Sequence, residues 1–174
     1  MPLLGAHLLR LILIVELSMC SSFKLHVNGK VHEYSPGSKI LVLNTPYEPN
    51  AEQGYLATWG IYGGERYNAR GESIMDLDLW VGPFITGRVL IPVSSFREYT
   101  CDFRSDDNRV LMVAGILKDN EVAMITTDAN EMVARVHHRM PAIIPWDLQL
   151  DYLLGTPEDA QKMLVPYPGF LHAS

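Results

Sequence analysis

Short blocks of apolar and β-branched residues recur along the chain, and each block predicts a β-strand. Asn28-Gly29 lies between apolar flanks and is the strongest indication of a tight hairpin turn. Lys118-Asp119-Asn120 separates two long apolar runs and predicts a second hairpin. The strands that we expect lie at residues 39–44, 54–62, 88–93, 110–117 and 121–127.

Helical patterns gather toward the end of the chain. Asp128, with Glu131 three residues later, predicts a capping box at the start of a helix that ends before Pro141. A second helix is expected at residues 146–154. A third is expected to begin at Thr156-Pro157, because Thr is a favourable N-cap and Pro suits the first helical position.

The order of these elements predicts the fold class. One or two further helical turns are expected at residues 72–80, stopped by Gly82-Pro83. Strands fill the middle of the chain and helices come late, which is typical of an α+β protein with a curved, mostly antiparallel, barrel-like sheet and a few flanking helices. A length of 174 residues suits a single domain that needs no metal or disulfide to hold its core. We expect neither a metal ion nor a cofactor.

The charge of the chain constrains its partners. The formal net charge is −6, which by itself argues against a nucleic-acid partner because affinity for DNA depends on cations placed against phosphates. A DNA-binding protein of this charge must therefore concentrate its arginines in one groove. The arginines near the chemical segments described below are Arg66, Arg70, Arg88, Arg97, Arg135 and Arg139.

The start of the chain has an unusual composition. Residues 8–17 form an apolar run interrupted by Arg10, and the run is too short for a bilayer, which takes about 20 apolar residues. It is interpreted either as a signal-like segment or propeptide, or as a mis-assigned or removable extension ahead of a true start at Met19. We favour a start at Met19 for a chemical reason given below. The chain is accordingly divided into an extension, residues 1–18, and a domain, residues 19–174.

The two cysteines, Cys20 and Cys101, are too few for a disulfide framework and favour a reducing compartment. The sequence leaves open whether these two cysteines form a disulfide with each other. The sequence predicts no role for Cys101.

Four segments carry the residues that could do chemistry. Taken singly each is ordinary, since a lone cysteine is most often a buried thiol and a histidine at a helix end commonly bonds carbonyl groups. Only their order and spacing are informative. The segments are Met19-Cys20, Asn68-Ala69-Arg70-Gly71-Glu72, Phe96-Arg97-Glu98-Tyr99 and His137-His138-Arg139-Met140-Pro141.

In this order the segments resemble the SOS-response-associated peptidase (SRAP) family. The resemblance runs from Met19-Cys20 to the His-x-Arg-Met-Pro motif and covers most of the chain. The most specific part is the Asn-Ala-Arg-x-Glu motif followed by His-x-Arg-Met-Pro. Weaker matches elsewhere along the chain are Tyr34-Ser35-Pro36-Gly37, Trp59-Gly60, Arg88 to Tyr99 and Ala114-Gly115-Ile116.

The resemblance implies a protein that recognises abasic sites in single-stranded DNA and shields them as a covalent DNA–protein crosslink. The bond forms at a cysteine that begins the mature chain, which here matches Cys20. Glu98 matches the family's catalytic glutamate, His137 its catalytic histidine, and Asn68 the asparagine that positions the cysteine and substrate. The positions that match DNA contacts are Arg70, Thr126, Arg139, Pro36 and Trp59.

The residue types suit this chemistry. An abasic deoxyribose is a masked aldehyde, and a cysteine with a free α-amine is a 1,2-aminothiol that can close a five-membered thiazolidine on it. Glu98 or His137 can act as the general acid that opens the sugar and expels hydroxide. A residue ahead of Cys20 would leave only an amide nitrogen, which cannot form the ring. Autocleavage before Cys20, reflected in the family's name, is a second route to the free amine.

The chain departs from the family pattern at positions that contact DNA. Ser21 and Ser22 follow the cysteine where the family has Gly-Arg, so one expected arginine is missing. The stretch from Gly60 to Asn68 lacks the usual Pro and second Trp, and Tyr99 replaces the common Trp. We therefore expect the chemistry to be retained and the binding of DNA to be weakened or altered.

Two other functions stay open. Cys20, His137 and Glu98 would suit a thiol hydrolase as nucleophile, base and orienting group. The other alternative is a degenerate, non-enzymatic binding module that the N-terminal run exports or anchors.

For the leading hypothesis, an abasic-site lyase or crosslinking protein, we expect a cytoplasmic, nucleoid-associated monomer. Its expected partners are single-stranded DNA containing abasic sites and the replication machinery, with no stable membrane partner.

Overall fold

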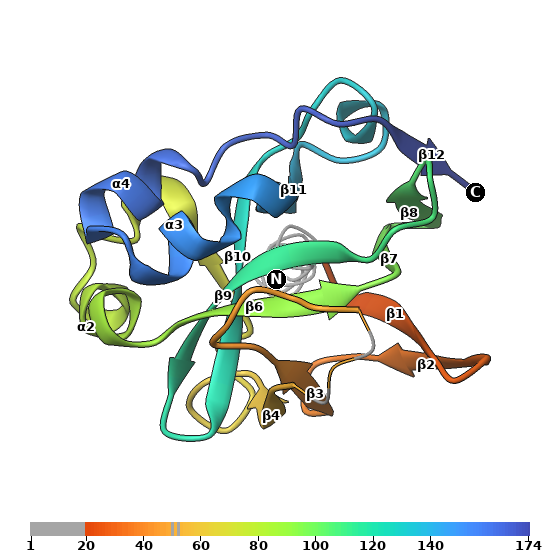
Figure 1. Cartoon of the computed structure of the whole chain (residues 1–174). Coiled ribbons are helices and arrows are strands. Elements are labelled where there is room, and N and C mark those ends of the chain that lie inside the picture. Colours follow the sequence, from red (N-terminus) through yellow and green to blue (C-terminus); the bar gives the residue numbers. More distant parts are fainter. Residues whose placement is uncertain (1–19, 50, 52) are drawn as a thin grey trace, which may run out of the picture.

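The fold is described from a computed structural model, which places residues 20–49, 51 and 53–174. The extension expected at residues 1–18 lies outside these described residues. Two β-sheets form a nearly closed, barrel-like body, and helices α2, α3 and α4 gather on one side of it (Figure 1). The structure confirms the predicted class, a single domain of mostly antiparallel strands with few helices.

The first sheet is antiparallel throughout and has the strand order β12-β8-β7-β1-β2. Asn28 and Gly29 have φ angles of 50° and 74°, the left-handed conformation that a tight two-residue hairpin turn needs. The predicted hairpin between β1 and β2 is therefore confirmed. The strand bounds are β1 (Ser22–Val27), β2 (Lys30–Tyr34), β7 (Ser95–Glu98), β8 (Cys101–Ser105) and β12 (Leu171–Ala173).

The second sheet has the order β3-β4-β10-β9-β6, and β5 and β11 also pair with β10. Strand β10 runs parallel to β4 and β5 and antiparallel to β9 and β11. All five strands predicted from the apolar blocks are found here, with small shifts at their ends. The bounds are β3 (Lys39–Val42), β4 (Tyr55–Trp59), β5 (Asn68–Arg70), β6 (Arg88–Val93), β9 (Leu111–Lys118), β10 (Glu121–Asp128) and β11 (Arg139–Pro141).

The second sheet is the central layer and is buried on both faces. In β6, Val89 and Ile91 enter the core between the two sheets, whereas Leu90 enters a second core that contains the helices. In β10, Val122 faces the first core and Ala123 the second. Burial on both faces explains why these strands are continuous apolar runs rather than alternating patterns.

The late helices lie close to where the sequence predicts them. A 3-10 turn, η3 (Trp146–Leu148), leads into α3 (Gln149–Leu154), and α4 (Pro157–Lys162) follows. The Thr156 hydroxyl accepts a hydrogen bond from the backbone N–H of Asp159 at 3.1 Å, which confirms the predicted N-cap. None of the described helices has the length and apolar character that a bilayer-spanning helix requires.

The helix predicted to start at Asp128 is wrong. Only one 3-10 turn forms there, η2 (Val133–Arg135), and the side chain of Asn130 accepts a hydrogen bond from the Val133 N–H at 3.0 Å. Asp128 instead ends β10, where it pairs with Arg139 of β11. Residues 139–141 pair with the edge of β10 as strand β11, and this pairing prevents a longer helix from forming before them.

The predicted stop at Gly82-Pro83 is also wrong. Residues 71–73 form the separate 3-10 turn η1 (Gly71–Ser73), and α2 (Asp78–Thr86) contains Pro83. Trp80 and Phe84, four residues apart, are both buried in the second core. Packing of these two large side chains offsets the hydrogen bond that Pro83 cannot make.

Candidate functional site

Three of the predicted chemical residues meet at one point. Glu98 is 2% exposed, and its two carboxylate oxygens lie 3.2 Å and 3.3 Å from the backbone nitrogen of Cys20, which donates to them. Nδ1 of His137 lies 3.1 Å from Glu98 Oε2. The carboxyl group therefore joins the nitrogen of the predicted nucleophile to the imidazole.

The first sheet brings Cys20 to Glu98. Strand β1 starts two residues after Cys20 and pairs with β7, with Ser22 opposite Arg97. Glu98 is the last residue of β7, so this register carries the start of β1 alongside the end of β7. His137 lies between η2 and β11 of the second sheet, and its backbone N–H donates to the carbonyl oxygen of Val133 at 2.9 Å. The site thus lies where the two sheets meet.

The surroundings shift the ionisation of all three groups. Burial raises the pKa of Glu98 to about 8, although the hydrogen bond from the Cys20 backbone opposes this. Burial, followed by the charge of Glu98, raises the pKa of the Cys20 thiol. Burial also lowers the pKa of His137. A carboxyl group that gains and loses its proton near neutral pH is suited to general acid–base catalysis.

Asn68 lies at the start of β5, half-buried, opposite Met124 of β10. Its neighbour Tyr67 is close enough to Cys20 that the thiolate charge adds to burial in raising the pKa of the phenol. The start of β5 therefore lies near the cysteine, as the asparagine's predicted role requires. Sequence reasoning missed Tyr67, and the only indication of it was its position next to the Asn-Ala-Arg motif.

Two further rings flank His137. Tyr99 contacts it edge-on, with ring centroids 5.2 Å apart, and the His138 ring is tilted against it with centroids 4.6 Å apart. Tyr99 is 56% exposed and His138 is also exposed, whereas His137 is buried. The buried imidazole is thus in contact with two exposed rings, one of which is a second imidazole.

The five predicted DNA contacts differ in exposure. Arg70 is exposed at the end of β5, and Pro36 is half-buried in the turn between β2 and β3. Trp59 and Thr126 are fully buried, and Arg139 is 3% exposed. In this conformation only Arg70 presents a charged group that a phosphate could reach.

Arg139 is held by an internal network. Its guanidinium donates to the carboxylate of Glu72 through both Nη atoms, to Asp128 Oδ1 at 2.8 Å and to the carbonyl oxygen of Thr126 at 3.0 Å. The hydrogen bond from Arg139 is the main cause that lowers the pKa of Glu72, and the charges of Arg139 and Arg70 add to it. The network ties β10 and β11 to η1, which directly follows the end of β5.

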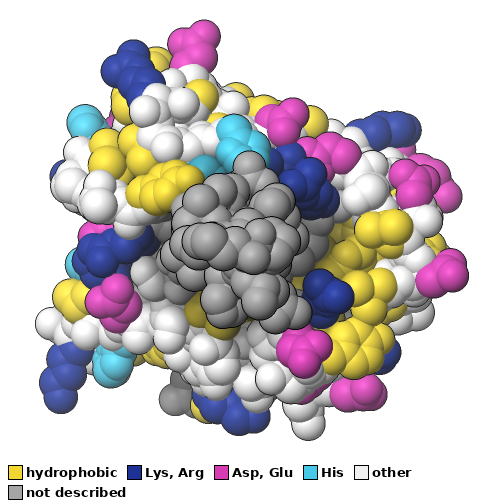
Figure 2. Space-filling view, turned by 180° about the vertical axis from the view of Figure 1, so that it is seen from behind, with side chains coloured by type: hydrophobic (Ala, Val, Ile, Leu, Met, Phe, Trp, Pro, Cys, Tyr) yellow, Lys and Arg dark blue, Asp and Glu magenta, His cyan; other side chains and the backbone are white. Residues whose placement is uncertain are grey.

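Other arginines are also engaged within the protein. Arg88 donates to the backbone carbonyls of Phe84, Tyr152 and Gly155, and Arg97 makes a bidentate pair with Asp102. On the described part of the face in Figure 2, Lys and Arg side chains are interspersed with Asp and Glu. The arginines therefore do not gather in a continuous basic strip on that part of the surface.

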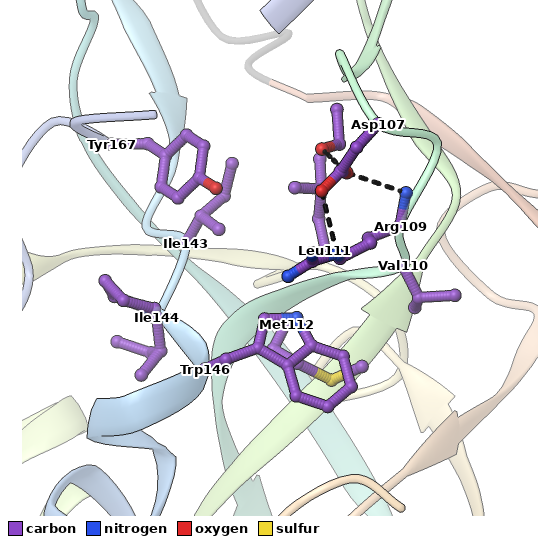
Figure 3. A pocket seen from close by; sticks show the side chains of 11 residues that line it. Asp107, Arg109, Val110, Leu111, Met112, Ile143, Ile144, Trp146 and Tyr167 are labelled. Carbon is purple, nitrogen blue, oxygen red and sulfur yellow. Dashed lines mark hydrogen bonds and ion pairs between the residues drawn. The ribbon is translucent and has the colours of Figure 1, made fainter. Parts of the chain in front are cut away.

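A cavity near the start of β9 contains none of the predicted site residues. Figure 3 shows the Asp107–Arg109 ion pair beside Trp146 and Tyr167.

Both described cysteines are free thiols, which answers the question of a disulfide between Cys20 and Cys101. Within residues 20–49, 51 and 53–174, no group of three or more His, Cys, Asp or Glu side chains is arranged to hold a metal ion.

Comparison with known proteins adds to this geometry. A model of the family described as SOS response associated peptidase (SRAP) matches residues 24–173. The abasic site processing protein YoaM of Bacillus subtilis (strain 168) is 26% identical over 129 residues, which are 60% of this chain and 56% of that protein. The chain thus matches little more than half the length of this relative.

Several solved structures share the fold. A protein from Bordetella bronchiseptica superposes with a TM-score of 0.73 at 18% identity, covering 89% of this chain and 98% of that one. A protein from Bacteroides thetaiotaomicron gives 0.65 at 16% identity, covering 82% and 76%. A phage-related protein from Bordetella bronchiseptica gives 0.62 at 19% identity, covering 86% and 83%. These likenesses support the barrel-like fold.

Proposed function

Because the chain belongs to the SOS response associated peptidase (SRAP) family, we propose that it processes abasic sites in single-stranded DNA by forming a thiazolidine crosslink through Cys20. The name of the similar Bacillus protein, an abasic site processing protein, supports this substrate class. The observation that carries the proposal is the contact of both Glu98 oxygens with the Cys20 nitrogen.

In this proposal the working chain begins at Cys20. Its nitrogen is then an α-amine, whose pKa in free peptides is about 8. Start of translation at Met19 followed by methionine removal would produce this end, as would cleavage before Cys20. A carboxylate 3.2 Å from that nitrogen can accept its proton and leave the amine free to attack.

The chemistry then follows from the positions of the three groups. The amine adds to the aldehyde carbon of the opened sugar and gives a carbinolamine. Glu98, which now carries the proton that it took from the amine, returns a proton to the hydroxyl, and water leaves. The Cys20 thiol adds to the resulting iminium carbon and loses its proton to Glu98 or His137. Since both nucleophiles belong to one residue, ring closure is intramolecular and has a high effective molarity.

The same geometry weighs against the thiol hydrolase. That mechanism needs a base at the cysteine sulfur, whereas the Glu98 contact is with the nitrogen of Cys20. Among the described residues, no hydrogen bond joins the Cys20 sulfur to His137. The amine route therefore uses the contacts that are present.

The experiment compares two forms of the protein, one starting at Cys20 and one retaining residues 1–19. Each is mixed with a single-stranded oligonucleotide in which one uracil has been excised, and is analysed by denaturing gel and intact mass. The form starting at Cys20 should gain the mass of the oligonucleotide less one water. The longer form, if it stays uncleaved, should give no adduct because its Cys20 nitrogen is an amide.

Two cysteine variants complete the test. Cys20→Ala should abolish the adduct, and Cys101→Ala, which removes the other free thiol, should keep it. A covalent band that persists in Cys20→Ala would overturn the proposal. Hydrolysis of a thioester or peptide substrate by the longer form, dependent on Cys20, would favour the hydrolase instead.

A further inference from the structure

The exposed histidine next to His137 has no role in the mechanism so far. We propose that His138 relays a proton between the buried Glu98–His137 pair and solvent during crosslinking. This inference rests on the proposed function and adds a group to it. In this proposal His138 acts through His137, which makes it a positioning residue for proton transfer.

The proton balance of the reaction creates the need for a relay. An ammonium, a thiol and an aldehyde combine to give a neutral thiazolidine, one water and one proton. The C–N and C–S bonds form at the former aldehyde carbon, the C–O bond breaks, and no electron is gained or lost. One proton per crosslink must therefore leave the site, and it must return if the ring is to open again.

The first acceptor of that proton is not in contact with bulk solvent. Glu98 lies beside the Cys20 nitrogen, and its side chain is 2% exposed. The next group is His137, with Nδ1 3.1 Å from Glu98 Oε2 and a side chain that is 5% exposed. A further titratable group in contact with solvent would therefore give a proton taken up by Glu98 a route out of the site.

His138 is placed to be that group. Its ring lies 4.6 Å from the His137 ring, centroid to centroid, and its residue is exposed. Imidazole exchanges protons near neutral pH and can accept at one nitrogen while donating from the other. His137 can take up a proton at Nδ1 and release one from Nε2. The resulting Nδ1–H then faces the carbonyl oxygen of Arg139, 3.2 Å away, which can accept a hydrogen bond from it.

The other groups around His137 do not offer this route. Tyr99 contacts the ring edge-on from the β7–β8 turn. The Arg139 guanidinium keeps its proton at any working pH, and the nearby carboxylates of Glu72 and Asp128 are ion-paired to it. Among the described neighbours of His137, His138 combines an imidazole ring with exposure to solvent.

The test uses the form that starts at Cys20 and measures the rate of adduct formation in dilute, non-imidazole buffer. His138→Ala should slow it by about a hundredfold, the lower end of what positioned proton transfer contributes. Added imidazole should restore much of the rate, because it can replace the missing ring. The matched control is His172→Ala, another exposed histidine, in β12, which should neither slow the reaction nor respond to imidazole.

The outcomes separate the relay from the underlying function. Slow crosslinking rescued by imidazole, with an unchanged melting temperature, supports the relay. A variant that reacts as fast as the wild type, or is slow without rescue, overturns the relay while the crosslinking function stands. If the wild type forms no Cys20-dependent adduct, the proposed function fails, and the relay fails with it.

Discussion

The Glu98 carboxylate binds the backbone nitrogen of Cys20 through both of its oxygens, across 78 positions of sequence. A thiol protease would need its general base at the cysteine sulfur, whereas the Glu98 carboxylate is hydrogen-bonded to the cysteine nitrogen. A buried carboxyl group beside a nitrogen is costly unless the nitrogen carries a positive charge or the carboxyl stays protonated. Both conditions occur in turn if that nitrogen is an amine that gains and loses a proton.

Glu98→Gln should slow crosslinking by about 10²–10⁴-fold, the usual contribution of a general acid–base group. Glutamine keeps a hydrogen-bond acceptor for the Cys20 nitrogen but cannot move a proton. Reversible binding of intact single-stranded DNA should stay unchanged, which fluorescence anisotropy would measure beside the single-turnover rate. An equal loss of binding and rate would mean that Glu98 shapes the DNA surface instead.

The same substitution should change how stability depends on pH in the form that retains the residues before Cys20. The pKa of Glu98 is about 8 in the folded state, against an ordinary value of 4.5. The folded state therefore holds this proton more tightly, and the free energy of unfolding falls as pH rises from 4.5 to 8. Above that window the ionised group costs on the order of a few kcal/mol, at about 1.4 kcal/mol per pKa unit.

Glu98→Gln should thus raise the melting temperature at pH 8.5 and leave it nearly unchanged at pH 4, since glutamine does not titrate. Thermal denaturation across this pH range would measure the effect. The control Glu131→Gln, at an exposed glutamate, should follow the wild-type curve. Parallel curves for Glu98→Gln and wild type would show that the carboxyl group ionises normally in the fold.

Arg139→Ala should destabilise the protein by about 3 kcal/mol, because it removes a buried cation bonded to Glu72, Asp128 and the Thr126 carbonyl. The loss should appear as a lower urea midpoint with an unchanged m-value. The exposed Arg135→Ala is the matched control and should stay within about 0.5 kcal/mol of wild type. If Arg139→Ala kept full stability but lost DNA affinity, the arginine would be a phosphate contact after all.

Arg70→Ala should act on DNA binding and leave stability unchanged, because this arginine is exposed at the end of β5. Each phosphate contact to single-stranded DNA contributes about 0.7 to the slope of log affinity against log salt. The variant should lose about that much of the slope and bind more weakly at low salt. Anisotropy titrations at several salt concentrations would measure it. An unchanged slope would place the DNA path away from β5.

Local patterns in the sequence predicted much of the fold. The Asn28-Gly29 hairpin needs only two adjacent residues that tolerate positive φ, and the Thr156 cap needs only a hydroxyl before a proline. Such interactions lie within one turn, so they can be recognised from neighbouring residues. The two errors, after Asp128 and at Pro83, occur where long-range pairing or packing outweighs local preference.

The site divides in the same way. The sequence by itself determined which residue types are present and in what order, and the motifs at residues 68–72 and 137–141 were enough to indicate the family. It also determined that Cys20 can act as an aminothiol only at a chain start, which is a matter of covalent chemistry.

Only the tertiary structure decided what surrounds each group. It buried Glu98 against the Cys20 nitrogen, placed His138 on His137, and enclosed Arg139 among carboxylates while leaving Arg70 exposed. Burial and electrostatic environment depend on which strands meet, here β1 with β7 and β10 with β11. Those pairings join residues far apart in the chain, so their effect on proton affinity and exposure cannot be predicted from residues that are adjacent in the sequence.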